Sequence, residues 1–280
     1  VCLWDKKSTE VLIPPPPRID YGRSYRGQLF LPEFNDNRFR ASFQLGENTF
    51  SMIDLKSNTA LFWARDASEL PYWVTGAPLR TLLHWWLGSK GVQLVHGAAV
   101  GTEKGGALLT AKGGSGKSTV ALACLQAGLN YFGDDYVAIG RDPDPLIHSL
   151  YSSGKLERDQ IKNFPNLKPL ISNPDKLDEE KALIFLHQKY PNRLPKCVPL
   201  KAILIPRFSG EKCTRITEAL PKDALLGMVP TTMFQLPLVD KCTFKNLKKF
   251  VETIPCYFLE TGTDISLIPD VLIDFIEQAH

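Results

Sequence analysis

The clearest hydrophobic pattern lies in the middle of the chain. Residues 93–100 and 106–110 are short apolar runs next to glycine, which is typical of buried strands. The polar turn at residues 102–106 predicts that these two strands form a hairpin. Residues 119–128 follow with apolar side chains at helical spacing, and Gly128 stands where glycine commonly follows a helix. The pattern therefore predicts a hairpin, a loop and a helix, in that order.

The N-terminal part of the chain has short β-like runs. They cover residues 28–31, 40–45, 49–53 and 60–63, with a hairpin turn at residues 56–58. The four prolines at residues 14–17 predict a stiff, extended connector, with an SH3-type ligand as the alternative. A helix is expected over residues 79–87, whose leucines share one face with Trp86. We therefore expect a small β-rich N-terminal subdomain at residues 1–78 and a second domain at residues 79–280.

Strand-like and helix-like runs alternate through the rest of the chain. Strands are predicted at residues 130–132, 136–139, 181–186, 200–206, 214–217 and 256–259, and helices at residues 221–228, 244–253 and 269–278. Residues 163–180 are rich in Pro, Asn, Asp and Lys and are expected to form a loop. This alternation predicts an α/β domain in which helices flank a mixed sheet.

Composition limits the classes of function. The 280-residue chain is 44% hydrophobic and 22% charged, which is ordinary for a globular protein, and its net charge is +3. This charge is too weak and dispersed to predict a nucleic-acid partner, and no apolar run has the length of a membrane span. The six cysteines are scattered without a C-x-x-C pair, as reduced thiols in a cytoplasmic protein would be. We expect a cytoplasmic protein that contacts neither nucleic acid nor membrane.

The loop before the predicted central helix matches the phosphate-binding pattern A-x-x-x-x-G-K-S, from Ala111 to Ser118. Its glycines allow backbone N–H groups to point at one polyphosphate, and the following helix adds its positive N-terminus. Lys117 would reach the β- and γ-phosphates of ATP, and the Ser118 hydroxyl would bind Mg²⁺. The predicted nucleotide-binding residues are Gly113, Gly114, Ser115, Gly116, Lys117, Ser118 and Thr119. The alternative, a chance match in a glycine-rich turn, is disfavoured by the flanking strand and helix.

Two acids, Asp134 and Asp135, follow the next predicted strand. A metal-orienting carboxylate is expected at such a place, because Mg²⁺ needs oxygen ligands opposite the phosphates. Two adjacent acids suggest two roles: one holds Mg²⁺, directly or through water, and the other accepts a proton from the attacking group. A polar turn that closes the strand is the alternative.

Three other side chains are candidates for the same site. Arg207 ends a predicted strand and would stabilise phosphate charge if that strand joins the same sheet; otherwise it is a surface charge. Ser153 and Lys155 lie in a run of small polar residues and are candidate substrate contacts. Lys155 is also an alternative to Arg207 for neutralising the developing charge. Taken alone, His96 is better explained as a core histidine bonded to the backbone.

The block from His96 to Ile139 resembles the catalytic domain of HPr kinase/phosphorylase, whose fold is shared with ATP-dependent phosphoenolpyruvate carboxykinase. The whole chain looks more like the HPr-kinase-related kinases of bacterial peptide-tailoring clusters, among them the lasso-peptide kinases, which phosphorylate the C-terminal Ser of a precursor peptide. The resemblance rests on the order and spacing of His96-Gly97, a hairpin, a short strand, the G-S-G-K-S of residues 114–118, a helix, and Asp134-Asp135.

The resemblance implies roles for the matched residues. Asp134 would be the general base on a substrate hydroxyl, Asp135 and Ser118 would serve Mg²⁺, and His96 would lie near the metal or the phosphate. It implies an ATP- and Mg²⁺-dependent kinase that phosphorylates a serine-type hydroxyl of a peptide or small protein. HPr kinases are hexamers, so a homo-oligomer is a further expectation.

Two alternatives stay open from the sequence. The phosphate acceptor is either a peptide or a free small molecule such as serine, and the residues do not separate these two. A nucleotide-binding switch without phosphotransfer is the other alternative function. The adjacent acids argue against this switch, because nucleotide binding alone needs no spare carboxylate.

Overall fold

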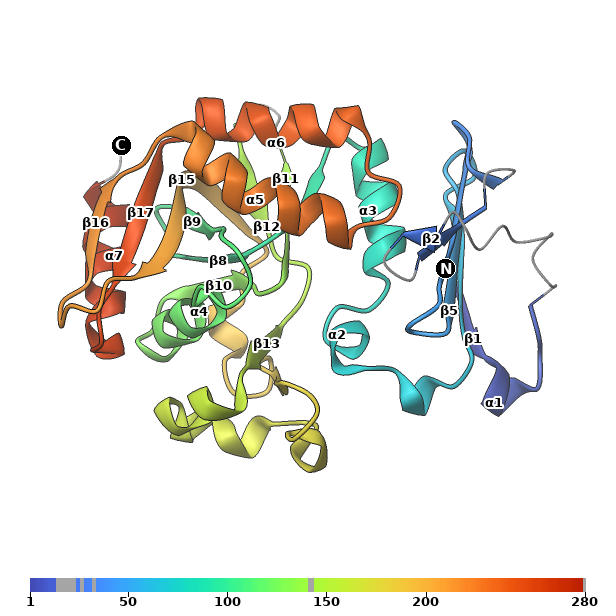
Figure 1. Ribbon diagram of the computed structural model, residues 1–280, viewed down its shortest axis with the longest axis horizontal. Helices are drawn as coiled ribbons and strands as arrows, with labels where there is room; N and C mark the ends of the chain where they lie inside the picture. Colours follow the sequence, from blue (N-terminus) through green and yellow to red (C-terminus); the bar gives the residue numbers. More distant parts are fainter. Residues whose placement is uncertain (14–23, 26–27, 32–33, 141–143, 279–280) are drawn as a thin grey trace. The chain divides into compact units, whose positions relative to one another are not determined.

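The computed structural model describes residues 1–13, 24–25, 28–31, 34–140 and 144–278 (Figure 1), and the predicted connector at residues 14–17 lies outside these ranges. The chain divides into two compact units: Val1–Gly91 with Leu236–Leu238, and Val92–Gln235 with Val239–His280. The first unit extends beyond the expected boundary at residue 78 because helix α3 (Arg80–Ser89) packs on that unit's sheet. None of the helices within the described residues is long and apolar enough to cross a bilayer.

The first unit is a sheet with α3 packed on it. Asn48 and Asn58 have φ angles of 49° and 52°, left-handed values that asparagine tolerates, and they close two successive hairpins. The hairpin predicted at residues 56–58 is therefore confirmed. The elements are β1 (Cys2–Asp5), α1 (Lys6–Thr9), β2 (Ser24–Tyr25), β3 (Gln28–Phe30), β4 (Phe39–Gln44), β5 (Thr49–Asp54), β6 (Thr59–Ala64), η3 (Ala67–Glu69), α2 (Tyr72–Thr75) and α3, with the strands in the order β1-β6-β5-β4-β3-β2.

The second unit is built on a mixed sheet, as the alternation of strands and helices predicted. The order along the sheet is β10-β8-β9-β15-β12-β11-β7, with β17 beside β15 and β16 beyond β17. The long strand β15 is parallel to β9 and to β17, and the other neighbours are antiparallel. The strands are β7 (Gln93–His96), β8 (Ala98–Gly101), β9 (Gly106–Leu109), β10 (Asn130–Gly133), β11 (Tyr136–Gly140), β12 (Leu146–His148), β15 (Cys197–Phe208), β16 (Arg215–Glu218) and β17 (Cys256–Thr261).

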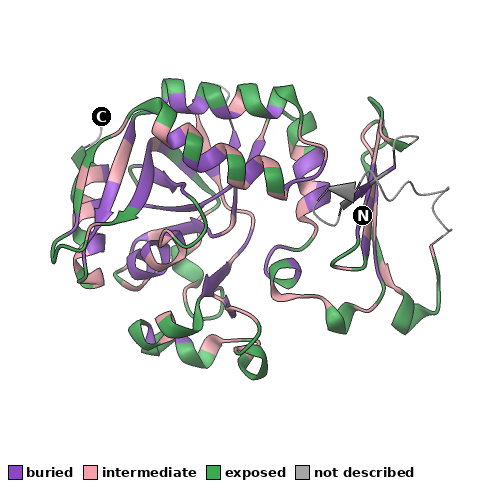
Figure 2. Cartoon of the chain, viewed as in Figure 1, coloured by how far each residue is buried: buried purple, intermediate pink, exposed green. Residues whose placement is uncertain are grey.

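Helices cover both faces of this sheet. Leu109 and Leu204 belong to the core on the face of α4 (Lys117–Gln126) and α7 (Ile268–Gln278). Leu108 and Ile203, their neighbours along the same strands, belong to the core on the face of α5 (Pro221–Gln235) and α6 (Lys241–Thr253). Side chains alternate between the faces of a strand, so one strand serves both cores. Figure 2 shows the buried residues concentrated on the strands between these helices.

The strand predicted at residues 93–100 is two strands, separated at Gly97. A Cβ atom on this residue would lie 2.7 Å from the carbonyl oxygen of Leu109, which is too close, so only glycine fits at this position. β7 pairs with β11, whereas β8 pairs with β9 and β10. A second break, at Asp134-Asp135, separates β10 from β11, and the Gly97 N–H donates to the Asp135 carbonyl at 3.0 Å. The two breaks therefore lie side by side, which brings His96 to Asp135.

Residues 153–185 form an excursion from the main sheet. Its ends pair as a hairpin, β13 (Ser153–Leu156) with β14 (Ala182–Phe185). The predicted loop at residues 163–180 contains short 3-10 helices, because Phe164 and Leu167 are buried in the core beside α4 and anchor it. The 3-10 helices of this unit are η4 (Arg158–Asn163), η5 (Pro165–Leu170), η6 (Pro174–Lys176), η7 (Pro191–Arg193) and η8 (Ile265–Leu267).

Helix α5 is longer than predicted. The expected helix ended at residue 228, before Pro230, but α5 continues through the proline to Gln235. Met228 and Thr232 are buried on its inner side, one on each side of Pro230, so packing against the sheet outweighs the cost of proline inside a helix.

We expect Gly97→Ala to destabilise the second unit by about 1–3 kcal/mol, because the added methyl group has no room beside the Leu109 carbonyl. Gly113→Ala is the matched control, since a Cβ atom there meets nothing within 4 Å. Denaturant unfolding of both variants measures the difference. Equal stabilities would contradict the proposed reason for the break.

Candidate active site

The phosphate-binding pattern forms a loop between the buried strand β9 and helix α4, as predicted. Gly114 and Gly116 have φ angles of 77° and 90°, so the backbone conformation itself calls for glycine there. A Cβ atom added to Gly113, Gly114 or Gly116 would meet nothing within 4 Å, so the space over the loop is open. The residues that the sequence assigned to the loop therefore lie at the start of helix α4 with open space over their glycines, as a ligand at a helix N-terminus would need.

Lys117 lies across the start of this loop. Its side-chain nitrogen donates to the carbonyl oxygens of Ala111 at 2.8 Å and Lys112 at 3.0 Å, and the residue is only 8% exposed. Burial lowers its pKa, while the charges of Asp134 and Asp135 act in the opposite direction. A bound phosphate group would offer this ammonium group negatively charged acceptors in place of two neutral carbonyl groups.

Asp134 is the buried acid of the site. It is 3% exposed and accepts hydrogen bonds from the Ser118 hydroxyl at 3.0 Å, the Asp135 N–H at 3.0 Å and the Lys155 N–H at 3.2 Å. Burial raises the pKa of Asp134 to about 6 and the charge of Asp135 adds to the rise, although the hydrogen bond from Ser118 and the charge of Lys155 oppose it. Through these hydrogen bonds the Asp134 carboxylate connects helix α4, the turn at residues 134–135 and strand β13.

Asp135 is the more accessible acid, with 26% of its side chain exposed. Its φ of 68° is left-handed, which aspartate tolerates better than most residues. One carboxylate oxygen forms an ion pair with the Lys155 ammonium, and the other lies 3.8 Å from His96 Nε2. Burial alone would raise the pKa of Asp135, but the positive charges of Lys155, His96 and Lys181 outweigh it and lower the pKa.

Strand β13 holds Lys155 in this position. A Cβ atom on Gly154 would lie 2.9 Å from Leu122 Cδ2 on α4, so glycine lets the strand approach the helix. The Tyr131 hydroxyl donates to the Ser153 carbonyl at 2.7 Å and also fixes the strand. The predicted contact residues Ser153 and Lys155 are therefore both buried, and the Lys155 side chain reaches the acid pair.

These residues fit a nucleotide phosphate with Mg²⁺. The Ser115 hydroxyl oxygen is buried in the loop and has no partner within the part of the chain that the structure describes. No three His, Cys, Asp or Glu side chains gather into a metal site among residues 1–13, 24–25, 28–31, 34–140 and 144–278. The side-chain oxygens of Ser118 and Asp134 lie 3.0 Å apart, and Mg²⁺ beside a nucleotide usually takes only one or two protein oxygens and completes its shell with phosphates and water, so these two would suffice.

The structure does not bring Arg207 into this cluster. It lies near the end of β15, where it follows Ile203 and Ile205 on alternating positions of the strand. Its guanidinium group forms an ion pair with Glu260 and lies 3.8 Å from the centre of the Phe258 ring. Arg207 is half exposed there, and Glu260 also pairs with Arg215.

Three residues beside the site were missed by the sequence analysis. The Tyr136 ring packs edge-on against His96, with their centres 5.4 Å apart, and its hydroxyl donates to Gln235 Oε1 at 3.0 Å. The Thr232 hydroxyl accepts a hydrogen bond from the His96 N–H at 3.1 Å. Tyr136 is adjacent to the two acids in sequence and could have been proposed. Thr232 and Gln235 lie about a hundred residues away, and no local pattern marks them.

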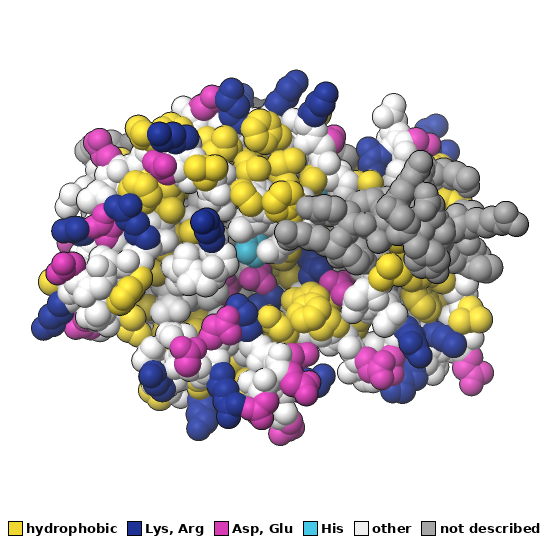
Figure 3. Space-filling model, in the orientation of Figure 1, with side chains coloured by type: hydrophobic (Ala, Val, Ile, Leu, Met, Phe, Trp, Pro, Cys, Tyr) yellow, Lys and Arg dark blue, Asp and Glu magenta, His cyan; other side chains and the backbone are white. Residues whose placement is uncertain are grey.

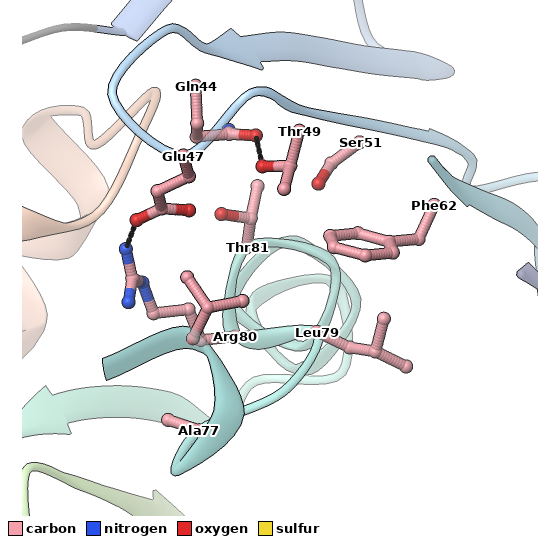
Figure 4. A pocket seen from close by; sticks show the side chains of 10 residues that line it. Gln44, Glu47, Thr49, Ser51, Phe62, Ala77, Leu79, Arg80 and Thr81 are labelled. Carbon is pink, nitrogen blue, oxygen red and sulfur yellow. Dashed lines mark hydrogen bonds and ion pairs between the residues drawn. The ribbon is translucent and has the colours of Figure 1, made fainter. Parts of the chain in front are cut away.

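A small pocket in the first unit has a different character (Figure 4). Its polar lining includes an ion pair between Arg80 and Glu47 and a hydrogen bond of 3.1 Å from the Thr49 hydroxyl to Gln44 Oε1. The cavity volume is about 10 Å³, which is room for a single water molecule. This pocket is too small to hold a nucleotide or a side chain of a substrate.

We expect the contribution of Asp134 to the stability of the protein without nucleotide to fall as pH rises from about 4 to about 6, by up to about 1.4 kcal/mol per pH unit. In this range the folded state keeps a proton on Asp134 that the unfolded chain, with the ordinary pKa of 3.8, releases. Asp134→Asn should lose this part of the pH dependence in urea unfolding measured at each pH. The exposed Asp274→Asn is the control, and an unchanged slope in Asp134→Asn would contradict the assignment.

Comparison with known proteins adds evidence at the level of structure. No protein-family model matches the sequence, and no curated protein matches it. Among solved structures, the chain is similar to the Hpr(Ser) kinase/phosphatase from Coxiella burnetii, with a TM-score of 0.37 and 12% sequence identity over 66% of this chain and 96% of that chain. At this level of similarity, function has to be derived from the residues of the site.

Proposed function

We propose that this protein is an ATP- and Mg²⁺-dependent kinase that transfers the γ-phosphate to a serine-type hydroxyl of a peptide or small protein. The observation that carries the proposal is the contact of the loop residue Ser118 with the buried Asp134, with the more exposed Asp135 directly beside it. A loop that only binds nucleotide needs one metal-orienting group. A second carboxylate at the open side of the same turn supports phosphate transfer to an acceptor.

On the donor side, the chain's own groups would hold and orient ATP. Backbone N–H groups of residues 113–117 would surround the phosphates, and the Lys117 ammonium would leave the carbonyls of Ala111 and Lys112 for the β- and γ-phosphates. Ser118 and Asp134 would hold Mg²⁺, which when bound neutralises charge on these two phosphates.

On the acceptor side, Asp135 would accept the proton of the attacking hydroxyl. The hydroxyl oxygen forms a bond to the γ-phosphorus, the bond to the β–γ bridging oxygen breaks, and ADP leaves with that electron pair. The transition state of such transfers is loose, so an ionised carboxylate that orients the hydroxyl suffices even when its pKa is low. The Lys155 ammonium beside Asp135 would stabilise charge on the transferred group, in place of Arg207.

The contacts thus support a different division of roles from the one implied by the resemblance to HPr kinase. Ser118 touches Asp134, so we assign Asp134 to the metal, and Asp135 has the more exposed side chain, so we assign it to the acceptor. His96 would hold Asp135 in place from the side opposite Lys155. From the resemblance to lasso-peptide kinases, we propose a precursor peptide as the acceptor class.

Lys117→Ala should reduce phosphate transfer from ³²P-labelled ATP by more than a hundredfold, because the ammonium group is the donor site's buried cation. Lys104→Ala, which removes an exposed lysine paired with Glu277, is the matched control. The acceptor is found by offering serine-containing peptides and free serine and measuring a mass gain of one phosphate. Phosphate gain by free serine alone would replace the peptide with a small-molecule acceptor. ATP binding without transfer to any acceptor, and without hydrolysis, would favour a nucleotide-binding switch.

Substitutions of the two acids should have different effects on Mg²⁺ dependence and on the transfer rate. Asp134→Asn should raise the Mg²⁺ concentration needed for half-maximal transfer, because it removes a metal ligand. Asp135→Asn should leave the Mg²⁺ dependence of nucleotide binding unchanged and lower the transfer rate by about 10²–10⁴-fold. Titrating Mg²⁺ in binding and transfer assays separates the two effects. The reverse pattern would restore Asp134 as the base.

A further inference from the structure

Helix α5 lies directly beside the candidate active site. Gly227 packs on the start of the phosphate-binding loop, where a Cβ atom would come within 3.2 Å of Ala111 Cα. Further along the same inner side, Thr232 accepts the hydrogen bond from the His96 N–H, and Gln235 accepts the one from the Tyr136 hydroxyl. The helix therefore touches the loop at one end and the surroundings of Asp135 at the other.

The outer side of α5 is unusually apolar. Leu226 is 68% exposed, and Pro230, one turn further on, is also exposed. Leu220, just before the helix, is 57% exposed, and Phe244 in the first turn of the adjoining α6 is 40% exposed. A surface helix usually places polar side chains at such positions. Figure 3 shows hydrophobic surface gathered over α5 and α6. We call these four residues the α5 patch.

Lysines adjoin the α5 patch. Helix α6 exposes Lys241, Lys245, Lys248 and Lys249, and α5 exposes Lys222 in its first turn. The acids of these two helices and of the N-cap of α6 are engaged locally: Glu252 pairs with Lys248, Asp240 accepts from the Thr243 N–H, and Asp223 accepts from the Leu220 N–H. The two helices pack against each other, so the patch and the lysines lie on neighbouring elements, and Figure 3 shows basic side chains at the border of the hydrophobic surface there.

We propose that the α5 patch and its lysines dock the acceptor polypeptide through a segment that carries apolar and acidic side chains close to the phosphorylated serine. This inference rests on the proposed kinase function and names the substrate class of that site. The apolar patch would bury the segment's apolar side chains, and the lysines would select acidic neighbours. An anionic membrane is less favoured as the occupant, because the inner side of the same helix contacts the site to which a hydroxyl must be delivered.

The test uses the full chain and two fluorescent peptides of equal length. Both contain one serine, leucines and a phenylalanine, and they differ only in carrying glutamates or lysines at the remaining positions. We expect the acidic peptide to bind more tightly in fluorescence anisotropy, and salt to weaken its binding. Leu226→Ser should weaken binding about tenfold, because one large apolar contact is lost. Phe208→Ser is the matched control, since Phe208 is 71% exposed at the end of β15 and outside the patch.

A second variant, Lys245→Glu with Lys249→Glu, should reverse the preference between the two peptides. In transfer assays, both patch variants should raise KM for the acidic peptide and leave kcat and the KM for ATP unchanged.

Failure of the docking proposal and failure of the kinase proposal give different results. Equal binding of both peptides, or binding unaffected by Leu226→Ser, would overturn the docking surface even if phosphate transfer is observed. Selective binding without transfer to any peptide or to free serine would keep the surface and remove the kinase function. Binding to phosphatidylserine vesicles that depends on Leu226, with no peptide binding, would identify a membrane-facing surface and overturn the docking proposal.

Discussion

The candidate site depends on one buried carboxylate. Asp134 accepts hydrogen bonds from the Ser118 hydroxyl and from the backbone N–H groups of Asp135 and Lys155. These donors come from the first turn of α4, the turn after β10 and strand β13, so a single side chain fixes three elements that the chain order keeps apart. A carboxylate this deeply buried is stable only because its oxygens are satisfied, which explains why the surrounding geometry is so closely constrained.

The two breaks in the central sheet have a common result. Gly97 ends one continuous strand and Asp135, with its left-handed backbone, ends another, and a hydrogen bond joins them. At each break the chain passes between the β7–β11 pair and the strands β8 and β10, which pair with each other in another part of the sheet. His96 and the acid pair therefore meet at the place where the strands change neighbours, which is where open α/β sheets often place ligands.

Different surroundings shift the pKa values of two adjacent and chemically identical acids in opposite directions. Asp134 is enclosed and its pKa is raised, whereas Asp135 lies between Lys155 and His96 and its pKa is lowered. Pairs of acids whose environments push their pKa values apart commonly divide the work of an active site. Helix α5 connects this chemistry to the protein surface, because its inner side contacts the residues around Asp135 and its outer side carries exposed leucine and proline.

The sequence by itself determined the local features. The glycines at 114 and 116, Lys117 and Ser118 form the predicted loop because positive φ angles and a helix start depend on nearest neighbours, and the flanking strand and helix are set by local hydrophobic period. Only the tertiary structure decided which distant side chains meet. It placed Lys155 on the acids, brought Thr232 to His96, ended β7 at Gly97 and turned Arg207 toward Glu260. These outcomes depend on strand register, on the face to which each side chain points and on the order of strands in the sheet, which no local pattern encodes.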